Sequence, residues 1–183
     1  MKNFKIEHEG KEYWISRSLS VMGVIIALEE DKVPRVLAVK RGKGCPDFVG
    51  YWNCPCGYLD YDETLNGACA REIAEETGYQ FKPEILNFFS INSSPLENRQ
   101  NVSAQFFCFI KGFPELVNFD KSEETEEVKW IPVNELSDYE WAFNHQYIIA
   151  NILEYGSKIL SKQGDSSEAA GTVQETPEPD SSN

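Results

Sequence analysis

The chain carries an arginine and four glutamates at fixed offsets within the stretch from Gly57 to Tyr79. These residues are Glu63, Arg71, Glu72, Glu75 and Glu76. Hard divalent cations such as Mg²⁺ and Mn²⁺ prefer oxygen ligands, carboxylates above all. The spacing therefore predicts a site that holds divalent cations against the oxygens of a phosphate group.

Three of the glutamates share one face of a predicted helix. Successive helical residues rotate by about 100°, so Glu75 and Glu76 lie on the same side as Glu72. Arg71 precedes Glu75 by four residues, a spacing that predicts an ion pair. Carboxylates packed this closely raise one another's pKa, and a bound Mg²⁺ or Mn²⁺ reverses that effect and keeps them ionised.

The helix that carries these side chains is predicted from about Glu63 to Thr77. Ile73, with Ala70 and Cys69, lies on the other flank, as docking onto a sheet requires. Gly78 follows at the position of a left-handed C-terminal cap. For the carboxylates taken alone, a solvated acidic helix face is the alternative interpretation.

The whole stretch fills the pattern GX5EX7REUXEEXGU, with Ile73 and Tyr79 at the two bulky hydrophobic positions U. This pattern resembles the Nudix box, and the chain is similar to the Nudix hydrolase family. The flanking sequences VLAVKRGKGCPDFVGYWNCPCGYLD and EEVKWIPVNELSDY extend the resemblance over about residues 20–160. The implied fold is an α/β/α sandwich, with a mixed β-sheet between helices.

The resemblance also implies a reaction and the residues that carry it. Family members hydrolyse a pyrophosphate bond in a nucleoside diphosphate linked to another group, with Mg²⁺ or Mn²⁺ as the cofactor. The implied metal ligands are Glu72, Glu75, Glu76 and the backbone carbonyl of Cys56. Arg71 would orient the glutamates, and Glu63 would brace the loop or reach the metal through water. The general base stays open between a box glutamate and a glutamate of a distant loop. The chain offers Glu123, Glu124, Glu126 and Glu127 there, and for each of them a solvated acidic turn is the favoured alternative.

One departure from the family concerns the turn before the box. The family usually has Pro-Gly-Gly, whereas this chain has Pro55-Cys56-Gly57. Replacing the first glycine restricts φ at that position, so the turn that presents the Cys56 carbonyl can differ from that of relatives.

Several residues outside the box are weaker candidates. Arg41 or Lys43, just before the loop that leads to the box, could bind a substrate phosphate; an exposed basic loop is equally compatible. Trp52 and Trp130 are expected in the core, with a role in a base pocket as the alternative. The two histidines, His8 and His145, are expected to be structural or exposed.

Composition favours an enzyme of ordinary domain size and disfavours nucleic acid as a partner. The chain has 183 residues and a formal net charge of −13, so it has no basic surplus with which to bind a phosphate backbone. No apolar run approaches the roughly 20 residues that cross a bilayer, and the N-terminus lacks a signal-peptide core, so we expect a cytoplasmic protein. Five cysteines without a CxxC pair indicate free thiols. A zinc site built from Cys45, Cys54, Cys56 and Cys69 is disfavoured by the usual ligand spacings.

Patterning divides the chain into one Nudix-like domain, residues 1–162, and an acidic tail, residues 163–183, that is too polar to order itself. A hairpin is predicted around Glu9-Gly10, and a last helix from Asp138 onward, with Trp141 on its apolar face. Further strands are predicted at residues 21–28, 35–40, 85–91, 103–110 and 128–132.

Substrate choice is the least determined feature. Pro95 follows Tyr79 by sixteen residues, close to where ADP-ribose hydrolases of the family often carry a proline. Oxidised nucleoside triphosphates and NADH are the other substrates that stay open. The expected partner is a small nucleotide, and a homodimer is a further possibility. The alternatives are a non-catalytic Nudix domain that senses a nucleotide and an interaction scaffold that uses the acidic tail.

Overall fold

The structure is a computed structural model that describes residues 3–30, 32–80, 82–97, 100–116 and 122–168, with side chains described as far as residue 158. Contacts divide the chain into two units, residues 1–149 and residues 150–183, and each is considered by itself. The first unit contains the sheet, the box helix and the candidate site.

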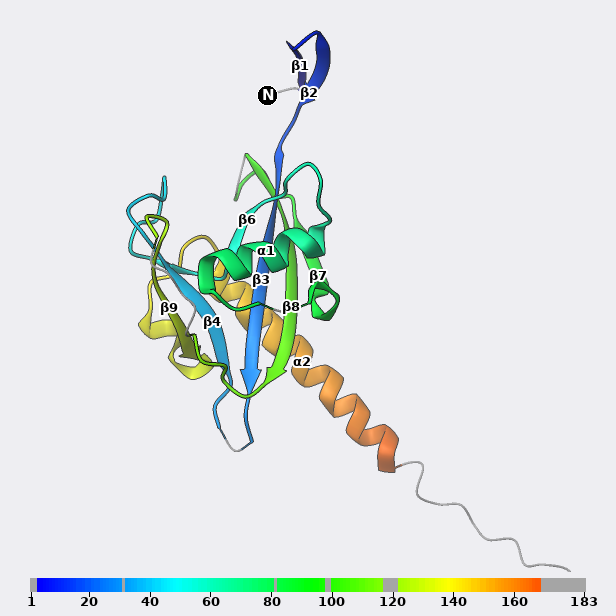
Figure 1. The fold of residues 1–183 in the computed structure, drawn as a ribbon. Helices are drawn as coiled ribbons and strands as arrows, with labels where there is room; N and C mark the ends of the chain where they lie inside the picture. The colour runs from blue at the N-terminus through cyan, green and yellow to red at the C-terminus, as the bar shows by residue number, and fades with distance from the viewer. Residues whose placement is uncertain (1–2, 31, 81, 98–99, 117–121, 169–183) are drawn as a thin grey trace, which may run out of the picture. The chain divides into compact units, whose positions relative to one another are not determined.

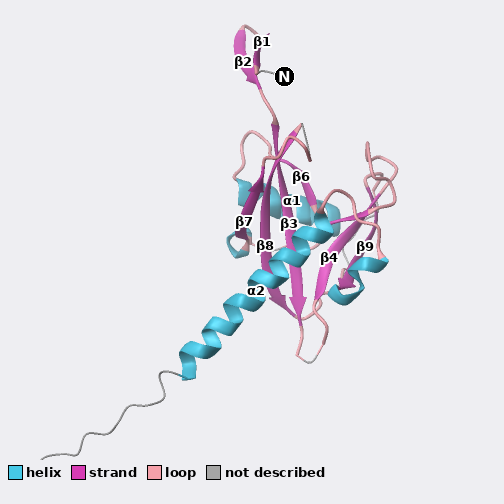
Figure 2. Cartoon of the chain, turned by 180° about the vertical axis from the view of Figure 1, so that it is seen from behind, coloured by secondary structure: helices cyan, strands magenta, loops and turns pink. Residues whose placement is uncertain are grey.

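A mixed seven-stranded sheet forms the centre of the first unit (Figures 1 and 2). Its strands are β3 (Ser18–Leu28), β4 (Arg35–Arg41), β5 (Trp52–Asn53), β6 (Cys56–Tyr58), β7 (Asn87–Asn92), β8 (Asn101–Lys111) and β9 (Thr125–Pro132). The order is β5-β4-β3-β8-β7, with β6 paired to β3 and β9 paired to β4. The long β3–β8 pair is parallel and the other pairs are antiparallel. The predicted α/β class with a mixed sheet is confirmed.

The sheet opens between β3 and β4, and this opening receives the turn before the box. The two strands pair only at one end, where Ile26 and Ala27 face Val36 and Arg35. Farther along, β6 pairs with β3 and β5 pairs with β4. The segment from Trp52 to Tyr58 therefore passes through the middle of the sheet.

Helix α1 (Leu65–Thr77) packs across β3 and β8 on one face of the sheet (Figure 1). Its Thr64 N-cap accepts a hydrogen bond from the Gly67 N–H, and Gly78 closes it in the left-handed conformation, with φ of 69°, as predicted. Ile73 and Cys69 are buried, also as predicted. The buried core under the helix consists of Val21, Ile25, Ala27, Leu37, Ala68, Cys69, Ile73, Leu86, Ala104, Phe106, Cys108 and Trp130.

The predicted N-terminal hairpin is confirmed. Strands β1 (Phe4–His8) and β2 (Lys11–Ile15) form a separate two-stranded sheet, and the turn residues Glu9 and Gly10 both have positive φ. That conformation is the one that a two-residue hairpin turn requires.

The last predicted helix begins later than its sequence pattern indicated. Two short 3₁₀ helices, η1 (Pro83–Ile85) and η2 (Val133–Asp138), are present, and α2 spans His145–Glu168. Placing Trp141 on that helix was wrong. The Trp52 N–H donates to the Glu140 carbonyl at 2.8 Å, and the Ala142 N–H donates to the Trp52 carbonyl at 2.8 Å, so this segment is extended beside β5.

Helix α2 continues six residues past the predicted start of the acidic tail, to Glu168. Residues 169–183, the rest of that tail, lie outside the described residues. Among the described residues, no helix is long and apolar enough to cross a membrane.

Candidate functional site

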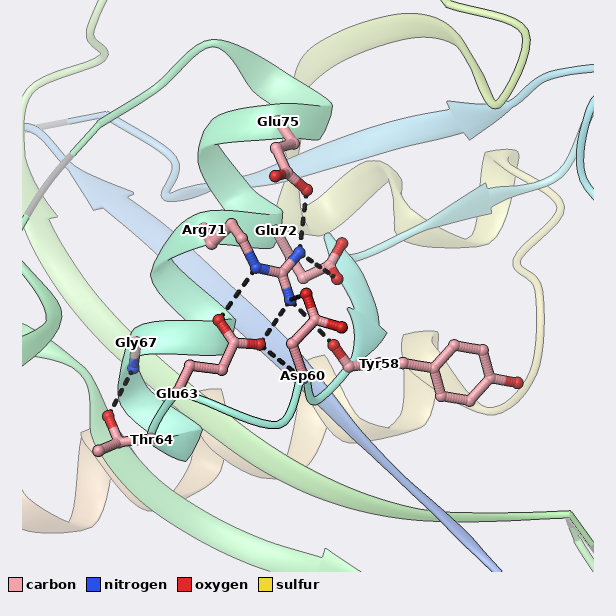
Figure 3. Close-up of polar contacts among 8 residues, drawn as sticks. All are labelled: Tyr58, Asp60, Glu63, Thr64, Gly67, Arg71, Glu72 and Glu75. Atoms are coloured by element: carbon pink, nitrogen blue, oxygen red, sulfur yellow. Dashed lines mark hydrogen bonds and ion pairs between the residues drawn. The ribbon is translucent and has the colours of Figure 1, made fainter. Parts of the chain in front are cut away.

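The guanidinium of Arg71 organises the carboxylates of the box (Figure 3). It contacts both oxygens of Glu63, at 3.0 and 2.7 Å. One of its nitrogens, Nη1, donates to Glu72 at 2.8 Å and to Glu75 at 3.0 Å, and Nη2 donates to the Tyr58 carbonyl at 2.9 Å. The predicted Arg71–Glu75 ion pair is confirmed. A single cation thus links helix α1, the loop before it and strand β6.

Glu63 braces the loop between β6 and α1, one of the two roles predicted for it. Besides the two contacts with Arg71, its Oε1 accepts a hydrogen bond from the Asp60 N–H at 2.8 Å. The hydrogen bonds from Arg71 lower the pKa of Glu63. Glu63 is therefore held ionised as the structural partner of Arg71.

Glu72 and Glu76 are the box carboxylates for which burial raises the pKa, so their ionised forms are the least stabilised by the surrounding protein. The Glu72 side chain is 14% exposed, and burial raises its pKa although Arg71 acts in the opposite direction. Glu76 accepts a hydrogen bond from the Cys56 N–H at 3.0 Å, and burial raises its pKa to about 8. The Glu75 side chain is 59% exposed. On this helix face, water therefore stabilises the ionised form of Glu75 well and those of Glu72 and Glu76 poorly.

Gly57 leaves the space into which the Glu72 carboxylate fits. A Cβ atom at position 57 would lie 2.1 Å from Glu72 Oε1 and 2.2 Å from its Cδ. Any other residue would therefore displace this carboxylate. The physical reason for glycine at the start of the box is close approach of the backbone to a charged side chain.

The donor chemistry of the site fits a hard divalent cation. It offers carboxylate and carbonyl oxygens, and two of its carboxylates have pKa values that a nearby cation would bring down. Within the described part of the chain, no three His, Cys, Asp or Glu side chains are gathered as a closed metal site; the carboxylates are instead bonded to Arg71 and to the Cys56 N–H. All five cysteines are free thiols. The metal roles of Glu72, Glu75, Glu76 and the Cys56 carbonyl stay predictions.

A loop from another part of the chain is fixed beside the site. The Gly42 N–H donates to the Glu124 carbonyl at 2.7 Å, and the Gly44 N–H donates to the Glu123 carbonyl at 2.7 Å. A Cβ at Gly42 would lie 2.3 Å from the Glu123 carbonyl oxygen, so the two loops are in backbone contact. The negative charge of Glu124 contributes to the raised pKa of Glu76. Among the four candidate glutamates of this loop, Glu124 is the one with a charge that acts on the pKa of Glu76.

Arg41 is the last residue of β4 and directly precedes Gly42, whose loop contacts the loop with Glu124. Its guanidinium donates to the Asp47 carbonyl at 3.1 Å and to the Asp47 carboxylate at 2.9 Å, and its side chain is 11% exposed. Its positive charge lowers the pKa of Glu76, against the larger effect of burial. Arg41 is thus close enough to act on the box electrostatically, while its contact with substrate stays a prediction.

Comparison with known proteins decides the family. The family model described as the NUDIX domain matches residues 18–152. The chain belongs to the Nudix family of hydrolases. A MutT-like protein from Streptomyces ambofaciens is 33% identical over 121 residues, which are 66% of this chain and 68% of that protein. An ADP-ribose pyrophosphatase from Methanocaldococcus jannaschii is 29% identical over 144 residues, 78% of this chain and 76% of that protein. The chain spans only about half of the matched Arabidopsis thaliana Nudix hydrolases 6 and 7.

Solved structures agree on the fold. The NUDIX domain of Shewanella oneidensis NrtR, complexed with ADP ribose, superposes with a TM-score of 0.63 at 24% identity and covers 77% of this chain and 89% of that one. A bifunctional NMN adenylyltransferase/ADP ribose pyrophosphatase from Francisella tularensis, complexed with AMP and a Mn ion, gives a TM-score of 0.58 at 22% identity. The match covers 76% of this chain and 42% of that protein. Both likenesses concern the Nudix fold.

His145 is structural, one of the two expectations for it, and it supports the turn before the Nudix box. The side chain is 6% exposed, and its Nδ1 accepts a hydrogen bond from the Cys54 N–H at 3.1 Å. Burial lowers its pKa to about 3, and the Arg41 charge acts in the same direction. A neutral imidazole therefore holds the backbone two residues before Cys56. Trp52 and Trp130 are buried, as expected of core residues.

Proposed function

We propose that this Nudix hydrolase cleaves the pyrophosphate bond of a nucleoside diphosphate joined to another group, with ADP-ribose as the first candidate, and that it uses Mg²⁺ or Mn²⁺. The observation that carries the proposal is the Arg71-centred array with Glu72 and Glu76 at its less exposed end. Such an array needs a cationic partner to stay ionised. A metal-bound pyrophosphate supplies both the cation and the bond to be broken.

The choice of ADP-ribose rests on relatives and on one residue. The Methanocaldococcus relative is named an ADP-ribose pyrophosphatase, and the NrtR domain was solved with ADP ribose. Pro95 lies in the loop after β7, sixteen residues beyond Tyr79. A cytoplasmic setting is part of the proposal and agrees with five free thiols.

In this mechanism the residues of the chain divide into holding, orienting and proton-accepting groups. Glu72, Glu75, Glu76 and the Cys56 carbonyl would hold the metal, which when bound supplies neutralisation of phosphate charge and a more acidic water. Arg71 fixes the rotamers of Glu72 and Glu75, and Glu63 fixes Arg71.

Glu124 is the proton acceptor in this proposal. Its loop is held in place by Gly42, and its charge acts on Glu76. As the oxygen of water forms a bond to one phosphorus, its proton passes to the Glu124 carboxylate and the bond between the bridging oxygen and that phosphorus breaks. With ADP-ribose the products are AMP and ribose 5-phosphate.

The test is product identification with a panel of nucleoside diphosphate derivatives, with and without Mg²⁺. We expect Mg²⁺-dependent cleavage of ADP-ribose, and loss of activity by several orders of magnitude in Glu72→Gln, which keeps the side-chain volume and the fold. Near-normal turnover by Glu72→Gln in Mg²⁺ would overturn its metal role. Tight nucleotide binding without cleavage of any panel member would favour a nucleotide-sensing domain instead.

A further inference from the structure

Two phenylalanines from loops far apart in the sequence meet at the surface next to Arg41. The ring centroids of Phe48 and Phe143 are 4.9 Å apart, with planes at 59°. The two residues are 42% and 43% exposed. Tyr51 contacts the edge of Phe48, with centroids 5.6 Å apart. The pair is thus a small, partly exposed aromatic surface.

Both phenylalanines have a backbone conformation that bulky residues rarely adopt. Their φ angles are 50° and 56°, in the left-handed region. Within the described residues, the other non-glycine position with positive φ is Glu9 in the hairpin turn. Strain of this kind persists where the surrounding structure imposes it, and such places concentrate at ligand-binding sites.

A continuous set of contacts joins the aromatic pair to the Nudix box. The Phe143 ring lies 5.3 Å from the imidazole of His145, and His145 accepts from the Cys54 N–H. Two residues later, the Cys56 N–H donates to Glu76. The aromatic pair is therefore linked, through His145, to the turn that contains Cys56 and contacts Glu76.

Arg41 interacts both with the aromatic pair and with the box: it stacks on Phe143, and its charge lowers the pKa of Glu76. Its guanidinium carbon is 5.3 Å from the centre of the Phe143 ring, and its Nη2 donates a hydrogen bond to the Asp47 carboxylate at 2.9 Å. A nucleotide carries a flat base and a phosphate, and aromatic rings beside an arginine offer a partner to each.

We propose that Phe48 and Phe143 bind the base of the nucleotide substrate by stacking, with Arg41 facing the adjoining phosphate. The inference rests on the proposed function for the kind of ligand, and it adds the subsite that would distinguish a nucleotide from a base-free sugar phosphate. The base stacks on the exposed side of one ring and meets the tilted face of the other. Stacking on side chains tolerates different bases, because every base has a π face.

The experiment compares equilibrium binding of AMP and ribose 5-phosphate in Mg²⁺ by calorimetry, for the wild-type protein and for Phe48→Leu and Phe143→Leu. Leucine keeps the Cβ atom and much of the apolar volume but removes the ring. We expect each variant to bind AMP about tenfold more weakly and to bind ribose 5-phosphate as before. Phe88→Leu, at a phenylalanine on β7 that is 54% exposed, is the matched control and should bind both ligands normally.

Equal affinities of the wild-type protein for the two ligands, or unchanged AMP affinity in both leucine variants, would overturn the stacking site. A proportional loss for both ligands would also overturn it, since it would reveal a purely structural pair. A second measurement needs no variant: AMP, but not ribose 5-phosphate, should shift the ring proton resonances of Phe48. Binding requires no turnover, so failure of the hydrolysis panel and failure of base stacking are separate results.

Discussion

At the scale of single residues, the site is an arrangement in which one arginine compensates part of a carboxylate cluster and leaves the rest for another cation. Arg71 satisfies Glu63 with two hydrogen bonds but reaches Glu72 and Glu75 through a single shared nitrogen. Glu76 has a backbone N–H as its partner. Removal of the ionisable group at Glu76 should therefore raise the stability of the metal-free protein and weaken its stabilisation by Mg²⁺.

We predict that Glu76→Gln raises the melting temperature in EDTA at pH 7. In the unfolded chain Glu76 ionises freely at this pH, whereas burial raises its pKa to about 8 in the fold, and a glutamine carries no such cost. The Gln oxygen can still accept from the Cys56 N–H. Mg²⁺ should stabilise the wild-type protein, by about 2.7 kcal/mol at 100 times its Kd, and should do so much less in the variant. Differential scanning fluorimetry in EDTA and across Mg²⁺ concentrations measures both effects.

The control for this experiment is Glu84→Gln, an exposed glutamate of η1 outside the box. It should leave the melting temperature and the Mg²⁺ response unchanged. If Glu76→Gln retains the full Mg²⁺ stabilisation, Glu76 does not bind the metal.

At the scale of elements, the sequence patterns predicted correctly those features that depend on residues close together in the sequence. The i,i+4 spacing placed Arg71 against Glu75, and Gly78 closes α1 as its position indicated. The late start of α2 could not be predicted in this way. The segment around Trp141 has helical spacing, but its backbone groups are hydrogen-bonded to Trp52, which is far away in the sequence.

The same limit applies to the parts of the candidate site outside the box. Nothing near Gly42 in the sequence indicates that its N–H meets the Glu124 carbonyl. Nor does local sequence indicate that Phe48 meets Phe143. These contacts depend on which strands become neighbours in the sheet, and β5 and β6, with two and three residues, are too short to be recognised by alternation.

The contact between the two loops leads to a prediction for Gly42→Ala. Its added Cβ would lie 2.3 Å from the Glu123 carbonyl oxygen, so the loop with Glu124 must shift from its position. We expect kcat to fall by about 10- to 100-fold, in the same direction as Glu124→Gln, while Mg²⁺ still stabilises the protein. Steady-state kinetics on the substrate identified by the panel, with the fluorimetric Mg²⁺ response, measure the two effects separately.

Gly67→Ala is the control for that variant, because a Cβ there meets only the Thr64 hydroxyl, at 3.2 Å, and lies within α1. It should keep kcat near the wild-type value. Wild-type kcat in Gly42→Ala would show that the position of the Glu124 loop does not matter for turnover.

At the scale of the whole molecule, the buried His145 makes the fold sensitive to acid. Burial lowers its pKa to about 3 in the folded protein, whereas an imidazole in the unfolded chain has a pKa of about 6.5. Between these values the unfolded state binds a proton that the folded state does not. The free energy of unfolding therefore falls as the pH decreases from about 6.5, by up to about 1.4 kcal/mol per pH unit from this residue.

We predict that in His145→Asn the free energy of unfolding decreases less steeply as the pH falls below about 6.5. The asparagine Oδ1 can accept the Cys54 N–H in place of Nδ1, and it does not titrate. Urea unfolding at pH values from 7 down to 4 measures the slope, and the difference between variant and wild type isolates His145 from the carboxylates that titrate in the same range. His8→Asn, at the exposed histidine of β1, should reproduce the wild-type slope. An equally steep slope in His145→Asn would show that the imidazole is protonated in the fold, and would remove it as the neutral support of the turn that leads into the Nudix box.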